Sequence, residues 1–251
     1  MKLPSFYTLL LMLIFINKSY SQQNINDSSI RMTIVSINYA FYLTGGDMAK
    51  RFGNSNSLGL TCSFKNTANY LFSASFDYLF GSNIKETDML DHLRTSAGYL
   101  ITGQGLLADV IMEERGYDLL LKAGKLKSFN WPNPNSGIYC QIGAGFIEHK
   151  ISFKYNNGPL NQLSKEYIKG YDRLTNGMTL YECIGYQFFS KHNLGNFHIA
   201  VEFLQAFTKN RRSWNFDTME QDTHLRYDLL YGINIGMDLP LYKRAVDQYF
   251  F

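Results

Sequence analysis

A carboxylate and an imidazole lie two residues apart in the segment Asp222-Thr223-His224. Such a pair could act as acid and base in a hydrolytic reaction, because an imidazole exchanges its proton near neutral pH. No Asp-x-Asp pair stands beside the segment to complete such a site, and this triplet is common by chance. We therefore expect Asp222 and His224 to lie in a solvated loop.

The sequence shows no other catalytic pattern. The G-x-S-x-G motif of serine hydrolases is absent. His149 and His198 could pair with a serine, but no spacing selects one, and His198 is expected to be hydrogen-bonded on the inner face of a strand. We therefore predict no catalytic residues.

Cys62, Cys140 and Cys183 are odd in number, widely spaced, and each lies inside a predicted strand. We interpret them as small apolar residues, buried or facing lipid, with one disulfide and a spare thiol as the alternative. Because no CxxC spacing occurs, we predict no metal site and no cofactor. Gly45-Gly46-Asp47 with Lys50-Arg51 lacks the Gly-Lys-Ser/Thr ending of a phosphate loop, and we expect a turn there.

Two segments combine basic and aromatic side chains, Lys165–Thr175 (KEYIKGYDRLT) and Thr208–Phe216 (TKNRRSWNF). Such surfaces can bind anionic lipopolysaccharide head groups or dock a partner barrel. The alternative is that their side chains only line the rim of the fold, with the arginines snorkelling and the tryptophan in an aromatic girdle. The candidate binding residues are Tyr171, Arg173, Arg211, Arg212 and Trp214.

The elements that must position these residues are strands. In Leu225–Leu239 every odd-numbered residue is Leu, Tyr, Ile or Met, whereas most even-numbered residues are small, polar or charged. This period of two over so many residues favours a membrane-spanning barrel strand over the shorter strands of a soluble sandwich. Similar alternation recurs in 36–43, 58–65, 70–80, 93–102, 106–113, 117–124, 138–146, 178–189 and 197–203. Only 178–189 is ambiguous, because Glu182 falls on its more apolar face; a bulge or inward placement of that face would explain it.

These segments predict an all-β fold, a closed antiparallel up-and-down transmembrane β-barrel of about ten strands, with eight as the alternative. An even count places both termini in the periplasm and the long loops outside. The outer connections would then be 44–57, 81–92, 154–176 and 208–224, with a short outer turn at Arg115-Gly116. The periplasmic connections would be 65–68, 103–105, 128–136 and 190–196.

The inner face of this barrel is predicted to be charged. Because charges of both signs are present, a narrow lumen can pair them, which favours a filled interior over a wide pore. The inward charged residues are expected to be Asp77, Arg94, Asp109, Lys122, Glu202, Arg226 and Asp228.

Residues 1–21 are expected to be a secretory signal peptide, with Lys2 before the apolar segment Phe6–Ile16 and small residues at Ser19 and Ser21. Residues 22–251 would form the barrel. The formal net charge of +3 falls to about +1 without Lys2 and Lys18, so nucleic acid is not an expected partner. No later stretch of eighteen apolar residues predicts a membrane helix.

The chain resembles the small outer-membrane β-barrel proteins of Bacteroidota in its signal ending Ser-x-Ser-Gln, Tyr/Phe-rich strands, Asn-rich loops and aromatic end Tyr249-Phe250-Phe251. That resemblance implies the cell outer membrane. It implies as partners the outer-membrane lipid, including lipopolysaccharide, the barrel-assembly machinery and other outer-membrane proteins. Asp222 and His224 are similar to the rim pair of the omptins, ten-stranded outer-membrane proteases, which also need a second acidic pair that is missing here.

We therefore expect a non-enzymatic outer-membrane barrel, structural or an accessory subunit of an envelope complex. A narrow pore for transport is the second hypothesis. A surface-facing protease or lipid-active enzyme is the third, and a soluble lipocalin-like barrel with its aromatic face inward is the fourth.

Overall fold

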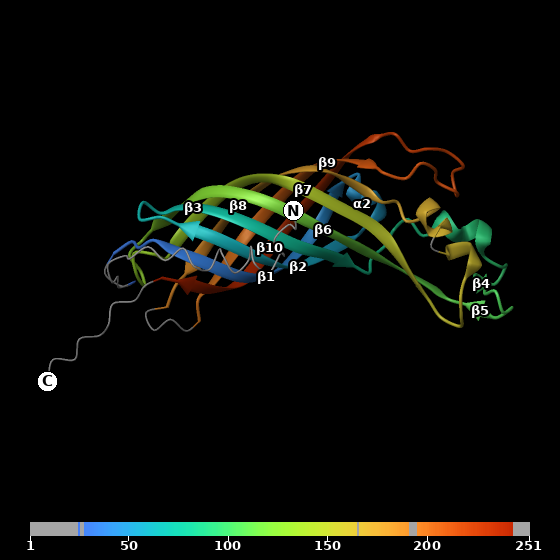
Figure 1. Ribbon diagram of the computed structural model, residues 1–251, viewed down its shortest axis with the longest axis horizontal. Coiled ribbons are helices and arrows are strands. Elements are labelled where there is room, and N and C mark those ends of the chain that lie inside the picture. The colour runs from blue at the N-terminus through green and yellow to red at the C-terminus, as the bar shows by residue number, and fades with distance from the viewer. Residues whose placement is uncertain (1–24, 26–27, 165, 191–194, 243–251) are drawn as a thin grey trace, which may run out of the picture.

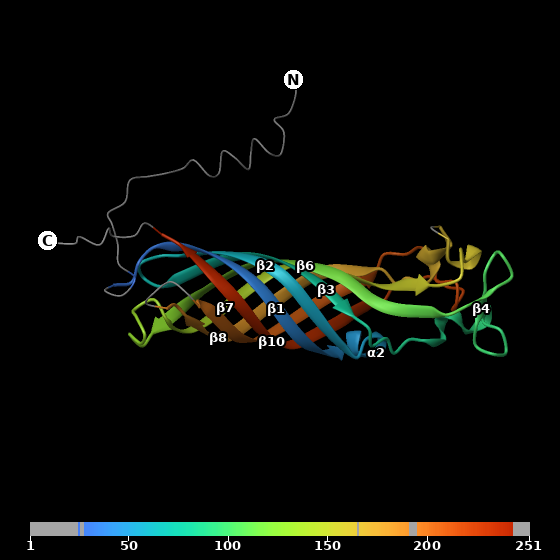
Figure 2. The ribbon, with the colours of Figure 1, turned by 90° about the horizontal axis from the view of Figure 1, so that it is seen from below.

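The computed structural model describes residues 25, 28–164, 166–190 and 195–242. Eight long strands form a barrel, drawn in Figures 1 and 2. They are β1 (Met32–Gly46), β2 (Asn54–Lys65), β3 (Tyr70–Gly81), β6 (Val110–Ser128), β7 (Gly137–Tyr155), β8 (Thr175–Phe188), β9 (Phe197–Asn210) and β10 (Leu225–Leu241). Among the described residues, no helix is long and apolar enough to cross a membrane.

Each barrel strand pairs antiparallel with two neighbours. β1 pairs with both β10 and β2, so the sheet forms a ring without free edges. A row of paired residues that leaves β6 at Lys125 passes round the ring and returns to β6 at Arg115, ten residues away. Such a stagger requires tilted strands, by roughly 40° in barrels of this kind.

The two ends of the barrel differ. The three connections that follow β2, β6 and β8, none of them longer than eight residues, lie at the end where β1 begins and β10 ends, which we call the turn end. The opposite end, the loop end, carries four connections. The first contains α2 (Met48–Arg51), the second η1 (Asp88–Leu93), β4 (Leu100–Ile101) and β5 (Leu107–Ala108), and the third η2 (Asn161–Leu163) and η3 (Tyr167–Gly170). The fourth is 211–224.

The ring has eight strands, which is the alternative count and not the preferred ten. Segments 106–113 and 117–124 are not two strands joined by a turn at Arg115-Gly116. Their alternation runs on unbroken, because Glu114, Gly116 and Asp118 are successive inward residues of β6, and β7 pairs with all of it. Gly116 therefore belongs to a strand interior, where the sequence suggested a turn.

Segment 93–102 does not span the barrel either. Arg94 Nη1 donates to the carbonyl of Gly98 (2.7 Å), and Thr95 N donates to the carbonyl of Tyr99 (2.8 Å), so this stretch closes on itself as a tight turn. Leu100 and Ile101 alone form a strand in this segment, and they pair with β5 in a separate two-stranded sheet. Gly103–Gly105 thus lies at the loop end and not at the turn end, and Arg94 and Asp109 lie outside the lumen.

The second and third loop-end connections pack together into what we call the lobe, residues 88–109, 156–164 and 166–170, at the right of Figure 1. Gly103 N donates to the carbonyl of Pro159 (3.1 Å), and Asn157 Nδ2 donates to the carbonyl of Leu107 (2.8 Å). The lobe has a small apolar interior of its own, formed by Met89, Leu90, Leu100, Leu160 and Leu163. It extends the barrel beyond its eight-stranded part.

Outward-facing side chains form an apolar belt around the barrel. On β6 this belt runs from Lys125 to Arg115, with Tyr117, Leu119, Leu121 and Ala123 between them. Ten tilted residues span roughly 25 Å, the height of the apolar band of outer-membrane barrels. Exposed members on other strands include Ile37, Phe41, Leu58, Leu60, Phe72, Phe76, Ile142, Leu180, Ile184, Val201, Ile233 and Ile235.

The structure shows which way β8 faces and where the three cysteines lie. In β8, Glu182 faces outward with Leu180 and Ile184, so neither a bulge nor an inverted face is needed. Cys62 and Cys140 are exposed on the outer face and Cys183 is buried inside, and all three thiols are free. No disulfide therefore forms in this structure.

Candidate functional site

The lumen is filled by polar side chains from facing strands. Asp77, Lys122, Glu202 and Asp228 are buried inside it, as their sequence alternation predicts. Gly59 leaves the space that the Asp77 carboxylate occupies, since an added Cβ there would collide with it. The inward small residues thus make room for the charged ones.

Two of these charges, those of Glu202 and Lys122, have neutral aromatic partners. Tyr42 and Tyr181 donate to the two carboxylate oxygens of Glu202 at 2.8 and 3.1 Å, and the Lys122 ammonium lies 4.1 Å from the centroid of the Tyr181 ring. The lumen cavity beside these groups has a volume of about 30 Å³, enough for one or two waters. Such a filled interior favours a barrel without a wide channel.

The turn end of the lumen is covered. Lys65 is fully buried, and its Nζ donates to Ser29 Oγ (3.0 Å), the carbonyl of Ile30 (3.2 Å) and Asn135 Oδ1 (2.8 Å). Asn135 in turn donates to the carbonyls of Ile25 and Ser28, both at 2.9 Å. The stretch before β1 is therefore fastened to the connection after β6.

At the loop end, one buried arginine joins the connections. Arg173 binds Glu86 Oε1 through Nε (3.0 Å) and Asp217 Oδ2 through Nη2 (2.5 Å). Glu86 Oε2 lies 3.7 Å from Nε of Arg51. These four residues, which we call the mouth cluster, come from four different loop-end connections. Arg51 and Arg173 are only 3% and 4% exposed, so the contacts are well shielded from water.

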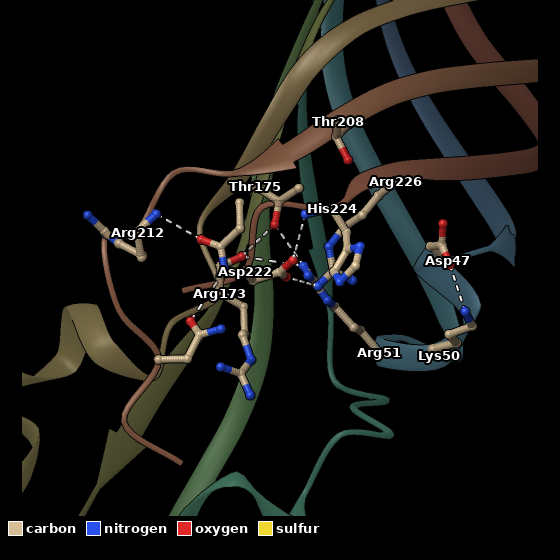
Figure 3. Close-up of polar contacts among 12 residues, drawn as sticks. Asp47, Lys50, Arg51, Arg173, Thr175, Thr208, Arg212, Asp222, His224 and Arg226 are labelled. Carbon is tan, nitrogen blue, oxygen red and sulfur yellow. Dashed lines mark hydrogen bonds and ion pairs between the residues drawn. The ribbon is translucent and has the colours of Figure 1, made fainter. Parts of the chain in front are cut away.

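Backbone contacts reinforce the mouth cluster. Arg51 Nη1 donates to Thr175 Oγ1 (2.8 Å), and that hydroxyl donates to the carbonyl of Arg173 (2.8 Å). Figure 3 shows Arg51 reaching from α2 toward Thr175 and Arg226. Arg173 has a φ of 51°, in the region that non-glycine residues seldom adopt, which the surrounding contacts must hold.

The charges at the mouth influence each other. Burial, together with the nearby positive charge of Arg226, lowers the pKa of Arg51 to about 10, so it remains charged at neutral pH. Burial also opposes the charge on Arg173, but the hydrogen bond that Arg173 donates to Asp217 and the charge of Glu86 outweigh it and raise the pKa of Arg173. Both arginines are therefore permanent cations of the cluster.

The structure places three of the five candidate binding residues in internal contacts. Tyr171 is 5% exposed, and its hydroxyl is hydrogen-bonded to His92 Nε2 (2.9 Å). Arg212 forms a bidentate pair with Asp172, with its Nε 2.8 Å from Oδ1. Arg173 is the centre of the mouth cluster. Their first role is to hold the loops together.

The other two candidate residues are more accessible. Trp214 is 44% exposed. Arg211 is exposed too, although its Nε donates to Asn176 Oδ1 (2.5 Å). An external ligand would therefore meet Trp214 and Arg211 before the other three.

Asp222 and His224 do not form an acid–base pair. The Asp222 carboxylate accepts from Arg226 Nη2 and from the backbone N–H of His224 (3.1 Å), and not from its imidazole. In the described part of the chain, no group of three or more His, Cys, Asp or Glu side chains is placed to hold a metal ion. The Asp222 side chain thus serves to anchor the fourth connection to β10.

Acid should loosen these loops. Burial raises the pKa of Asp222, but hydrogen bonds from Arg226 and His224 outweigh it and keep the pKa below the usual range. The hydrogen bond from Lys50 likewise lowers the pKa of Asp47. A carboxyl group whose pKa is lower in the folded protein than in the unfolded chain stabilises the folded state. This contribution is complete above about pH 3.9, the usual pKa of Asp, and is lost as the pH falls through the lowered pKa of the folded state.

We therefore expect hydrogen exchange in 211–224 to speed up between pH 5 and pH 2.5, after correction for the intrinsic rate, while the barrel strands stay protected. Asp222→Asn should show faster exchange already at pH 5 and a smaller further change on acidification. An unchanged pH profile in this variant would mean that Asp222 does not anchor the loop.

Sequence reasoning missed Glu86, Asp217 and Arg51. Each is an ordinary charged loop residue, and the contact between Glu86 and Arg173 joins residues 87 positions apart. No local pattern marks such a pair. The basic and aromatic composition of 165–175 and 208–216 did direct attention to this end of the molecule.

No protein-family model matches the sequence, and no curated protein matches it. Solved structures that are similar to it share 9–15% sequence identity with it. Ail, the attachment invasion locus protein of Yersinia pestis, in complex with the heparin analogue sucrose octasulfate, is 14% identical, with 84% of this chain and 99% of that chain covered and a TM-score of 0.42.

Neisserial surface protein A is 9% identical (81% and 95% covered, TM-score 0.39), and the outer membrane protein OprG of Pseudomonas aeruginosa is 13% identical (86% and 99% covered, TM-score 0.39). Small outer-membrane β-barrel proteins are the class that the sequence pattern predicts. Similarity at this level transfers no site residue or activity, and it does not bear on the resemblance to Bacteroidota.

Proposed function

We propose that the protein is a non-enzymatic outer-membrane β-barrel, structural or an accessory subunit of an envelope complex, that holds an ordered lobe at the cell surface. One observation carries this proposal: the barrel exposes a broad apolar belt outside and buries most of the charged side chains of its membrane-spanning part inside. A soluble barrel would expose the opposite faces, because apolar side chains in water are unfavourable. The belt therefore requires lipid.

The orientation follows from the connections. Outer-membrane barrels place short turns in the periplasm and long loops outside. The loop end with the mouth cluster and the lobe would then face the exterior, and the turn end with Lys65 the periplasm. The signal peptide 1–21 and the terminal aromatic residues 249–251, which would direct export and assembly, lie outside the described residues and stay predictions.

The proposed lipid contact includes the rim. Lys150, Lys209 and Arg211 are exposed just beyond the loop-end edge of the belt. Cations at that depth can attract the phosphates of lipopolysaccharide, a contact that high salt would weaken.

Fractionation tests the membrane assignment. The protein should be recovered with outer membranes, and its gel mobility should differ between boiled and unboiled samples, because a closed barrel resists unfolding by detergent. Recovery from the soluble periplasm or from the medium would contradict the proposal.

Conduction tests the closed interior. We expect no large, steady porin-like current when the purified protein is inserted in planar bilayers, because buried polar side chains fill the lumen and the cavity beside Lys122 and Glu202 has a volume of about 30 Å³. Sustained conductance of porin size would favour the transport hypothesis instead.

A further inference from the structure

One charged side chain lies where the belt should be purely apolar. The row of paired residues from Lys125 to Arg115 rises from the turn-end edge of the belt to its loop-end edge in eight strand-to-strand steps. The second of these steps reaches Ile184. Glu182 is two residues nearer the loop end on β8. Since ten residues span the belt, Glu182 lies close to half its height, at the middle of the bilayer.

Glu182 has no partner within its own barrel. It is exposed, and its opposite neighbours on β7 and β9 are Ile142 and Phe203. In the middle half of the belt, it is the one charged side chain that faces outward among the described residues. A carboxylate in lipid is unfavourable, and ionisable groups within membranes usually face protein or water.

We propose that the outer face around Glu182, on β7, β8 and β9, is an in-membrane contact with a second copy of this chain. This inference rests on the proposed membrane location. Two barrels inserted in the same direction and related by a two-fold axis along the membrane normal bring residues of equal depth together. Glu182 of one copy then meets Glu182 of the other.

The chemistry of the carboxyl group suits this arrangement. A protonated carboxyl is both a hydrogen-bond donor and an acceptor, so two carboxyls at one depth can satisfy each other without a cation. One strand away from Glu182, a shallow hollow over β3, β6 and β7 is lined by Ala144, Leu121 and, from β8, Met178. Small residues such as Ala144 let two membrane segments approach closely, and polar side chains then bind across the contact.

Crosslinking in lipid vesicles tests the contact. In a chain with Cys62→Ala, Cys140→Ala and Cys183→Ala, Leu180→Cys places a thiol beside Glu182. Leu58→Cys places the control thiol at nearly the same depth on β2, across the barrel from β8. With a membrane-permeable oxidant, we expect the Leu180→Cys dimer to exceed the Leu58→Cys dimer by roughly three- to tenfold.

Variants at Glu182 show whether its side chain holds the two copies together or whether the two cysteines are merely close to each other. Adding Glu182→Leu to Leu180→Cys should reduce the dimer to the level of the control, whereas Glu182→Gln should keep it, because an amide also donates and accepts. The leucine variant should fold well, since it completes an apolar face.

Heat-modifiable gel mobility of the same vesicles shows whether the barrel has inserted. If the barrels insert but crosslink equally at both cysteines, or if Glu182→Leu leaves the crosslinking unchanged, the proposed contact is wrong. The membrane assignment would remain intact in that case. Failure to insert would overturn both.

Discussion

Replacing Ile233 with arginine should cost roughly 2–4 kcal/mol of folding free energy in a bilayer and sharply reduce the fraction of heat-modifiable, inserted barrel. Ile233 is 53% exposed on the outer face of β10. It is also the fourth of the eight steps from Lys125 to Arg115, which places it at half the height of the belt. A guanidinium there must stay in hydrocarbon or distort the bilayer.

Leu225→Arg is the matched control. Leu225 lies on the same face of the same strand and is 60% exposed, but it is eight residues nearer the loop end, beyond the edge of the belt. The same substitution should cost there at most about 1 kcal/mol. Urea unfolding in vesicles of both variants measures the difference. Equal losses, or a larger loss for Leu225→Arg, would mean that the apolar face does not meet lipid.

A position in the lumen would be a poorer control. Asn234 does face inward, but it is 4% exposed and hydrogen-bonded to His198 Nε2 (3.1 Å). With a lumen cavity of about 30 Å³ beside it, an arginine at Asn234 would be overpacked. Its destabilisation would report crowding and not the direction of the face.

The facing of the strands could be predicted from sequence because it depends on a local rule. Successive side chains of a strand point to opposite sides, so alternation in β10 alone separates Ile233 from Asn234. The same rule places Asp77 and Glu202 inside. It also places Glu182 outside, against the expectation that a charge turns inward, because the register of a closed ring leaves one strand no freedom to invert.

The strand count and the mouth cluster could not be predicted in the same way. At Arg115-Gly116, charge and a glycine suggest a turn, but partners on β3 and β7 extend the strand through both residues. Pairing with another strand is a non-local fact. So is the meeting of Glu86, Arg173 and Asp217, which becomes visible only once the ring brings their connections to one end.

Removing the charge of Arg173 should loosen the whole loop end while leaving the barrel folded. In Arg173→Met the stem is retained, but Glu86 and Asp217 lose their shared partner. Loss of one member of a buried ion pair costs 3–5 kcal/mol. We expect about 3 kcal/mol, because the side chains of Glu86 and Asp217 are 26% and 16% exposed and keep some hydration. That corresponds to roughly hundredfold faster proteolysis of the loops.

The control is Arg211→Met, which removes a loop-end arginine that is exposed and lies outside the mouth cluster. This variant should change the cleavage rate little. The triple variant Arg173→Met, Glu86→Gln, Asp217→Asn separates two explanations of the main effect. If unpaired carboxylates cause the loosening, neutralising them should recover much of the protease resistance, because no uncompensated charge remains. If the arginine mainly fastens the four connections through its hydrogen bonds, the triple variant should be cleaved as fast as the single one. Cleavage of Arg173→Met at the rate of the unmodified protein would contradict both explanations, and the loops would then be held by the apolar interior of the lobe.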